Sequence, residues 1–223
     1  MKTGFKLGAM ALCFVALQAQ AAVLYDQTFA GTGNLFASQN DTAGGGFGNF
    51  ATVYDNFTLS ATASVTDVHW TGGYFSGSQS PIAGFTIQFW SDNAGTPGSS
   101  LFSTFIGGTA NETLLGNFGG LNVFTYSVNL ASAFQAQAGT EYWLSIVPDL
   151  VFPPQWGWAE SLDGDGAGVQ DFSGSRRQVP DMAFSLTGST SSAVPEPATL
   201  VLTGLGLAGL GLSRRKSPQK LVN

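Results

Sequence analysis

Three carboxylates in one glycine-rich segment are the clearest candidate for metal chemistry in this chain. Asp163 and Asp165 alternate with glycines in residues 161–166, and Asp171 follows them. Oxygen ligands at alternate positions, with glycines that permit tight turning, suit a hard cation such as Ca²⁺. The segment lacks the spacing and closing glutamate of an EF-hand, and Asp-Gly pairs also suit plain turns. A calcium site and an ordinary turn therefore both stand as hypotheses for these residues.

Histidine and cysteine offer little for catalysis. His69 is the single histidine, it lies between Val68 and Trp70 in a segment typical of a strand, and no Gly-x-Ser-x-Gly sequence supplies a nucleophile. One histidine without cysteine makes an improbable zinc site. We assign no catalytic residue and predict that the protein is not an enzyme. A secreted glycan hydrolase stays as an alternative, because sequence spacing does not reveal which carboxylates face each other across a cleft.

Aromatic residues supply the second kind of candidate binding surface. Trp156 and Trp158 fall on one face of the chain if this segment is extended, just after Pro153-Pro154 and before the acidic segment. Sugars stack on exposed rings of this kind, so these two tryptophans are the candidates for exposed rings that stack on glycan. The alternative is that most of the five tryptophans fill a core. A carbohydrate-binding module is accordingly the first alternative function.

These candidates lie in a segment whose residue pattern is typical of an all-β domain. Phe85, Ile87 and Phe89 alternate with polar residues, and so do Met182, Phe184 and Leu186. The sequence predicts about nine strands, which we expect to form an antiparallel, jelly-roll-like β-sandwich over residues 22–187. The glycine-rich stretch 31–50 is predicted to be a long loop, and 188–193 a Ser/Thr linker. The further predicted strands are 23–29, 54–60, 64–71, 101–106, 123–130, 142–147 and 156–159.

Charge is distributed very unevenly along the chain. Between the two ends there are two basic residues, Arg176 and Arg177, against thirteen acidic ones, which gives this part a net charge of about −11. Such a body does not bind nucleic acid or anionic lipid headgroups by electrostatics. Cations and neutral glycans are the partners compatible with this charge.

The N-terminal residues have the pattern of a cleavable signal peptide. Lys2 and Lys6 precede an apolar run over residues 7–17, and Ala19 and Ala21 are small residues at the positions that a signal peptidase reads. Cleavage before Ala22 removes residues 1–21 and with them Cys13, the single cysteine. The mature chain is therefore predicted to be secreted and to contain no disulfide and no thiolate.

The C-terminal residues combine a short polar signature, an apolar segment and a basic stop. Residues 198–212 would reach about 22 Å as a helix, which is short of the ~30 Å hydrocarbon core of a bilayer. The basic cluster of Arg214, Arg215 and Lys216 is costly to move across a membrane, so it is predicted to stay cytoplasmic with tail residues 217–223. Two prolines keep Glu196 out of the predicted transmembrane helix and display it at the membrane surface.

This tail closely resembles the PEP-CTERM sorting signal of exported proteins in exopolysaccharide-producing Gram-negative bacteria. The resemblance covers residues 194–216 and carries the recognition role to Pro195, Glu196 and Pro197. It implies that exosortase, a membrane enzyme with a catalytic cysteine, cuts near the motif and passes the protein to an acceptor at the cell surface or in the matrix. An ordinary C-terminal anchor is the alternative.

The body is also similar, more loosely, to a recurrent domain of PEP-CTERM proteins. This likeness rests on residues 85–93, 138–146, 156–158 and 181–184, and it implies a fold but no active site. Together these features predict an exported, non-enzymatic component of the cell surface or the exopolysaccharide matrix of a biofilm. Signal peptidase, exosortase and the membrane are the predicted partners, with exopolysaccharide as a further one, and calcium is the one cofactor considered.

Overall fold

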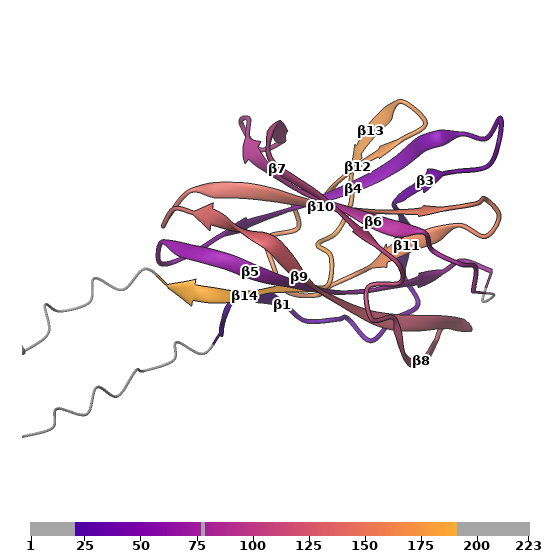
Figure 1. The fold of residues 1–223 in the computed structure, drawn as a ribbon, viewed down its shortest axis with the longest axis horizontal. Helices are drawn as coiled ribbons and strands as arrows, with labels where there is room; N and C mark the ends of the chain where they lie inside the picture. Colours follow the sequence, from indigo (N-terminus) through magenta and orange to yellow (C-terminus); the bar gives the residue numbers. More distant parts are fainter. Residues whose placement is uncertain (1–20, 77–78, 191–223) are drawn as a thin grey trace, which may run out of the picture. The chain divides into compact units, whose positions relative to one another are not determined.

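The computed structural model describes residues 21–76 and 79–190, and this part of the chain consists of strands, turns and loops without a helix (Figure 1). No helix in these ranges is therefore long and apolar enough to cross a bilayer. The predicted signal peptide up to Gln20, the transmembrane helix 198–212 and the basic stop lie outside the described residues. Ala21 and Ala22 are described, and both are exposed.

Seven strands form the first sheet, and all its pairings are antiparallel. The long strand β5 is its centre, because β9 follows one edge of β5 while β14 and then β11 follow the other. The remaining strands extend the sheet outward from these. In chain order the members are β1 (Ala22–Gln27), β2 (Leu35–Ala37), β5 (Ala63–Tyr74), β8 (Thr113–Phe118), β9 (Leu121–Ala136), β11 (Trp156–Ala159) and β14 (Phe184–Thr190).

The second sheet also has seven strands, and it is antiparallel except where the short β3 runs parallel to the end of β10. β10 lies between β4 and β6, and the hairpins β6–β7 and β12–β13 form its two margins. Its members are β3 (Gln39–Asp41), β4 (Gly48–Thr58), β6 (Gly84–Asp92), β7 (Pro97–Gly107), β10 (Glu141–Leu150), β12 (Val169–Phe172) and β13 (Ser175–Gln178).

One hydrophobic core joins the inner faces of the two sheets. Val65 and Val68 from the first sheet and Ile87 and Leu144 from the second are completely buried in the same cluster. Side chains alternate between the faces of a strand, so each strand turns one set of residues to the core and the other outward. The all-β prediction is confirmed, and the arrangement of the described residues is sandwich-like.

Several boundaries differ from the sequence-based predictions. The stretch 31–50 is not one long loop, because it contains β2, β3 and the beginning of β4. The predicted linker begins inside β14, which continues to Thr190, where Gly188 pairs with Ala22 and Val65. Strands β8, β12 and β13 were not predicted. They are short or carry few apolar residues, so periodicity gave little signal for them.

Glycine at position 72 is required by the packing of an indole ring. A Cβ atom on Gly72 would collide with the Trp156 ring, which crosses β5 at this point, and with the Gly157 carbonyl at 2.8 Å. β5 can therefore approach β11 this closely only because residue 72 has no side chain.

Replacing Gly72 by alanine is expected to lower the free energy of unfolding by about 1–3 kcal/mol, because the extra methyl group overpacks the core. Gly107→Ala is the matched control, since Gly107 also lies in a strand and nothing lies within 4 Å of its added Cβ. Urea unfolding of both variants measures the difference. Equal midpoints for the two would contradict this reading of the packing.

Candidate functional site

The predicted glycan-stacking pair does not form an exposed surface. Trp156 and Trp158 are both 0% exposed, so the prediction that their rings face solvent is wrong. The indole Nε1 of Trp158 donates to the Ala183 carbonyl oxygen at 3.0 Å, and that of Trp156 to the Tyr126 hydroxyl at 3.0 Å. β11 lies between β5 and β2 and is buried on both sides, which the sequence pattern of four residues did not reveal.

Trp156 belongs to a hydrogen-bonded chain that leads from the core to the surface. The Tyr126 hydroxyl donates to Glu112 Oε1 at 2.9 Å, and the Tyr74 hydroxyl donates to the same oxygen at 2.8 Å. Gln79 Nε2 donates to Glu112 Oε2 at 3.1 Å at the exposed end. Burial, followed by the neighbouring Glu112, raises the pKa of both tyrosines, so they stay neutral donors.

The carboxylates of the predicted calcium loop do not converge on one point. Asp163 Oδ2 accepts the Thr28 amide at 2.9 Å, whereas Asp165 Oδ2 accepts Asn56 Nδ2 at 3.0 Å. Asp171 is engaged by Arg176 on the neighbouring strand. Over residues 21–76 and 79–190, no group of three or more His, Cys, Asp or Glu side chains is arranged to hold a metal ion. The hydrogen bonds from Thr28 lower the pKa of Asp163, as expected for a carboxylate that anchors a loop.

Sequence reasoning missed a buried acid pair beneath this loop. Asp55 and Asp181 are 0% and 5% exposed, and the charge of Asp181, after burial, contributes to raising the pKa of Asp55. The Oδ1 atoms of both residues are buried without a hydrogen-bond partner, which favours the protonated, uncharged form of the carboxyl groups. The available signal was the alternation of Val53, Asp55 and Phe57, which places a carboxyl group on the core face of β4.

Other contacts fix Asp55 in the core. The Met182 amide donates to Asp55 Oδ2 at 2.6 Å, which ties β4 to the chain leading into β14. With the Gln27 amide assigned the orientation that satisfies its hydrogen bonds, Nε2 donates to Asp55 Oδ2 at 2.7 Å and the amide oxygen accepts the Tyr25 hydroxyl at 2.8 Å. Burial raises the pKa of Asp55 well above its usual range, and burial likewise raises that of Asp181. The pair is thus a structural feature that responds to pH.

A hollow with a volume of about 500 Å³ lies over the outer face of the first sheet. Asp26, Ser185, His69 and Ser127 form one cross-strand row through β1, β14, β5 and β9. Asn111 Nδ2 donates to Ser127 Oγ at 3.3 Å at the end of this row. The row supplies hydrogen-bonding groups, but no hydrogen bond among the described residues joins His69 to a serine or a carboxylate.

The sorting tail lies outside the described residues, and this includes the recognition residues Pro195, Glu196 and Pro197 and the basic residues Arg214, Arg215 and Lys216. Ala19, at the predicted signal cleavage site, also lies outside them. A comparison with protein-family models matches residues 193–216 to the PEP-CTERM protein-sorting motif. No curated protein and no solved structure matches the chain. The match supports an exported protein with a C-terminal sorting signal, and it covers the tail rather than the β domain.

Proposed function

We propose that this chain is an exported protein whose C-terminal tail is read and cut by exosortase, and whose β domain is a non-enzymatic component of the cell surface or the exopolysaccharide matrix. The match of residues 193–216 to the sorting motif is the observation that carries this proposal. Pro195, Glu196 and Pro197 act as the recognition residues. The apolar segment 198–212 holds the chain in the membrane until the cut, with Arg214, Arg215 and Lys216 on the cytoplasmic side.

The composition of the domain supports this role. Its net charge of about −11 keeps the domain away from anionic lipid headgroups. The domain has no cysteine, and its two sheets enclose an extensive aromatic core, so its stability depends on packing rather than on a redox state. These properties suit a protein that functions outside the cytoplasm. Signal peptidase removes the leader, with Ala19, Ala21 and Ala22 at the cut.

Mass spectrometry of the intact mature protein from its native host tests the proposal. The expected C-terminus lies close to Pro197, and the apolar segment is missing from the mature form. Replacing residues 195–197 by alanine is expected to abolish the cut and leave a membrane-bound chain that keeps the apolar segment 198–212. A change of Ser191 and Ser192 to alanine is the control, because both lie just before the matched motif. A wild-type chain that keeps its C-terminus would instead identify an ordinary anchor.

A further inference from the structure

We propose that the outer face of the second sheet carries a groove that binds a neutral saccharide chain. The groove has a volume of about 460 Å³ and lies on β4, β12 and β13. Its size is within the range of ordinary ligand sites. The lining side chains used in this argument are Asn49, Phe50, Thr52, Tyr54, Asp171 and Arg176.

The register of the strands explains why these residues meet. Thr52 pairs with Asp171, and Asp171 pairs with Arg176, so the three form one row across β4, β12 and β13. Phe50 and Tyr54 are on the same side of β4 as Thr52, whereas Val53 between them points to the core. One face of three adjacent strands therefore brings together two aromatic rings and a paired acid and base.

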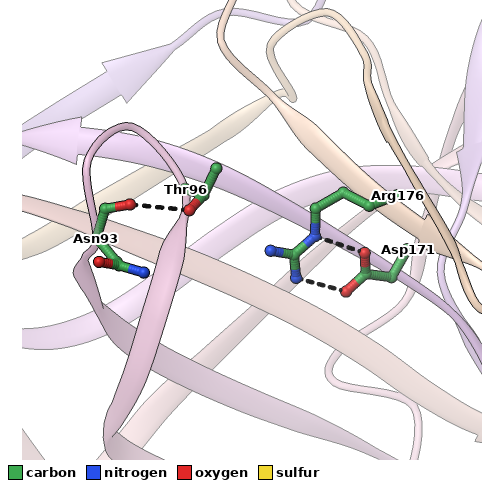
Figure 2. Close-up of polar contacts among 4 residues, drawn as sticks. All are labelled: Asn93, Thr96, Asp171 and Arg176. Atoms are coloured by element: carbon green, nitrogen blue, oxygen red, sulfur yellow. Dashed lines mark hydrogen bonds and ion pairs between the residues drawn. The ribbon is translucent and has the colours of Figure 1, made fainter.

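The pairing of Arg176 with Asp171 gives the groove adjacent donors and acceptors. Arg176 Nε donates to Asp171 Oδ1 at 2.7 Å and Nη2 donates to Oδ2 at 2.8 Å, as Figure 2 shows. Each side chain is partly exposed, at 46% and 34%, which leaves further guanidinium hydrogens and carboxylate lone pairs free for a ligand. Neighbouring sugar hydroxyls each donate and accept, so a diol matches this planar pair.

Aromatic contacts hold the groove in a fixed shape. The guanidinium carbon of Arg176 lies 6.0 Å from the centre of the Tyr54 ring, and Tyr54 meets Trp90 edge to face at 5.6 Å. Trp90 is itself fixed, because its Nε1 donates to Ser145 Oγ at 2.9 Å. Residues held in this way lose little conformational entropy when a ligand binds.

Further exposed rings contact Phe50, one of the residues that line the groove. Phe47 is 70% exposed and Phe152 is 38% exposed. The ring centres of Phe47, Phe152 and Phe172 each lie 5.9 Å from the ring centre of Phe50, and those of Phe47 and Phe152 lie 5.7 Å apart. The faces of such rings stack on the apolar faces of sugar units. This group of aromatic rings is longer than one ring, so an extended saccharide fits it better than a monosaccharide does.

Charge selects a neutral ligand. Arg176 and Asp171 neutralise each other within the groove, and the surrounding domain carries about −11. An anionic polymer is repelled by this field, whereas uncharged hydroxyl groups are not affected by it. This inference does not depend on how the tail is processed, because binding is measured on the purified chain.

The test screens the full-length chain, in a detergent without a sugar headgroup, on an array of neutral glucans, mannans, galactans and xylans beside uronate polymers. Titration calorimetry then measures the affinity for a hexasaccharide of each neutral glycan that binds. Arg176→Ala is expected to weaken binding at least about tenfold, because it removes charge-assisted hydrogen bonds. Arg177→Ala is the control, because it removes a positive charge from the adjacent residue, and Arg177 does not line the groove.

Arg176 is exposed, so its replacement should leave the fold intact, and circular dichroism checks this. Saturable binding to a neutral glycan, lost in Arg176→Ala and kept within about twofold in Arg177→Ala, supports the proposal. Three results would overturn it: no binding to any neutral glycan, binding to uronate polymers alone, or equal weakening by the two variants.

Discussion

Trp156→Ala is expected to lower the free energy of unfolding by about 3–5 kcal/mol, the range for large aromatic residues removed from a core. The ring is 0% exposed and packs edge to face on Phe85 and Tyr126, with ring centres 5.8 Å away in each case. The change also removes the hydrogen bond from the indole to the Tyr126 hydroxyl. Domains are stable by only about 5–15 kcal/mol, so this loss is a large part of the total.

Equilibrium urea unfolding followed by near-ultraviolet circular dichroism measures this loss. Trp90→Ala is the control, because Trp90 is only partly buried on the outer face of the second sheet. We expect a clearly smaller effect for Trp90, since less area is returned to water. If Trp156→Ala cost less than about 1 kcal/mol, the ring would not be a central part of the core.

Acidification from neutral pH to about pH 5 is expected to stabilise the fold through Asp55 and Asp181, since the native pair holds a proton that the unfolded chain releases. Burial raises the pKa of both groups in the folded protein, above the 3.8 of a free aspartate. The stabilisation is complete below the unfolded pKa and is lost as pH rises through the folded one. One retained proton gives a slope of up to about 1.4 kcal/mol per pH unit.

Other carboxylates act in the opposite direction at lower pH. Backbone amides of Phe152, Phe47 and Ala43 lower the pKa of Asp41, and Thr28 lowers that of Asp163. Their stabilisation is present above the unfolded pKa and is lost as pH falls through their folded pKa. The range between neutral pH and about pH 5 therefore isolates the effect of the buried pair.

Melting temperatures between pH 5 and 8 test this assignment. Asp55→Asn cannot ionise, so it is expected to flatten the pH dependence. Asp26→Asn is the control, because Asp26 is exposed on the first sheet. Wild-type stability that increases from pH 5 to 8 would show that the pair is not protonated in the native state.

The strand pattern could be predicted where alternation is strong, and less well elsewhere. Residues 85–89 and 64–71 fall within β6 and β5, as their alternating apolar residues indicated. In β13 all four residues, including Arg176, are exposed, so no hydrophobic period marks it as a strand. The strands in residues 31–50 were also missed, because the glycines of this segment suggested a loop, whereas backbone pairing makes β2, β3 and the beginning of β4 out of it.

Binding residues were harder to predict than strands. Two prolines and an acidic segment flank Trp156 and Trp158, and this context made them the candidates for exposure among the five tryptophans. β11 in fact lies between two strands of the same sheet, and its indoles fill the core. Conversely, Tyr54 and Arg176 are far apart in sequence, and only the pairing of β4, β12 and β13 brings them to one groove.

The sequence by itself determined the all-β class, the acidic charge of the body and the sorting motif at residues 193–216, because composition, period and short motifs are properties of neighbouring residues. The tertiary structure alone decided which aromatic rings are buried, that the loop carboxylates are separated and that Asp55 and Asp181 are buried. These outcomes depend on strand register and on the packing of one sheet against the other. Both involve residues distant in sequence, whose positions no local pattern specifies.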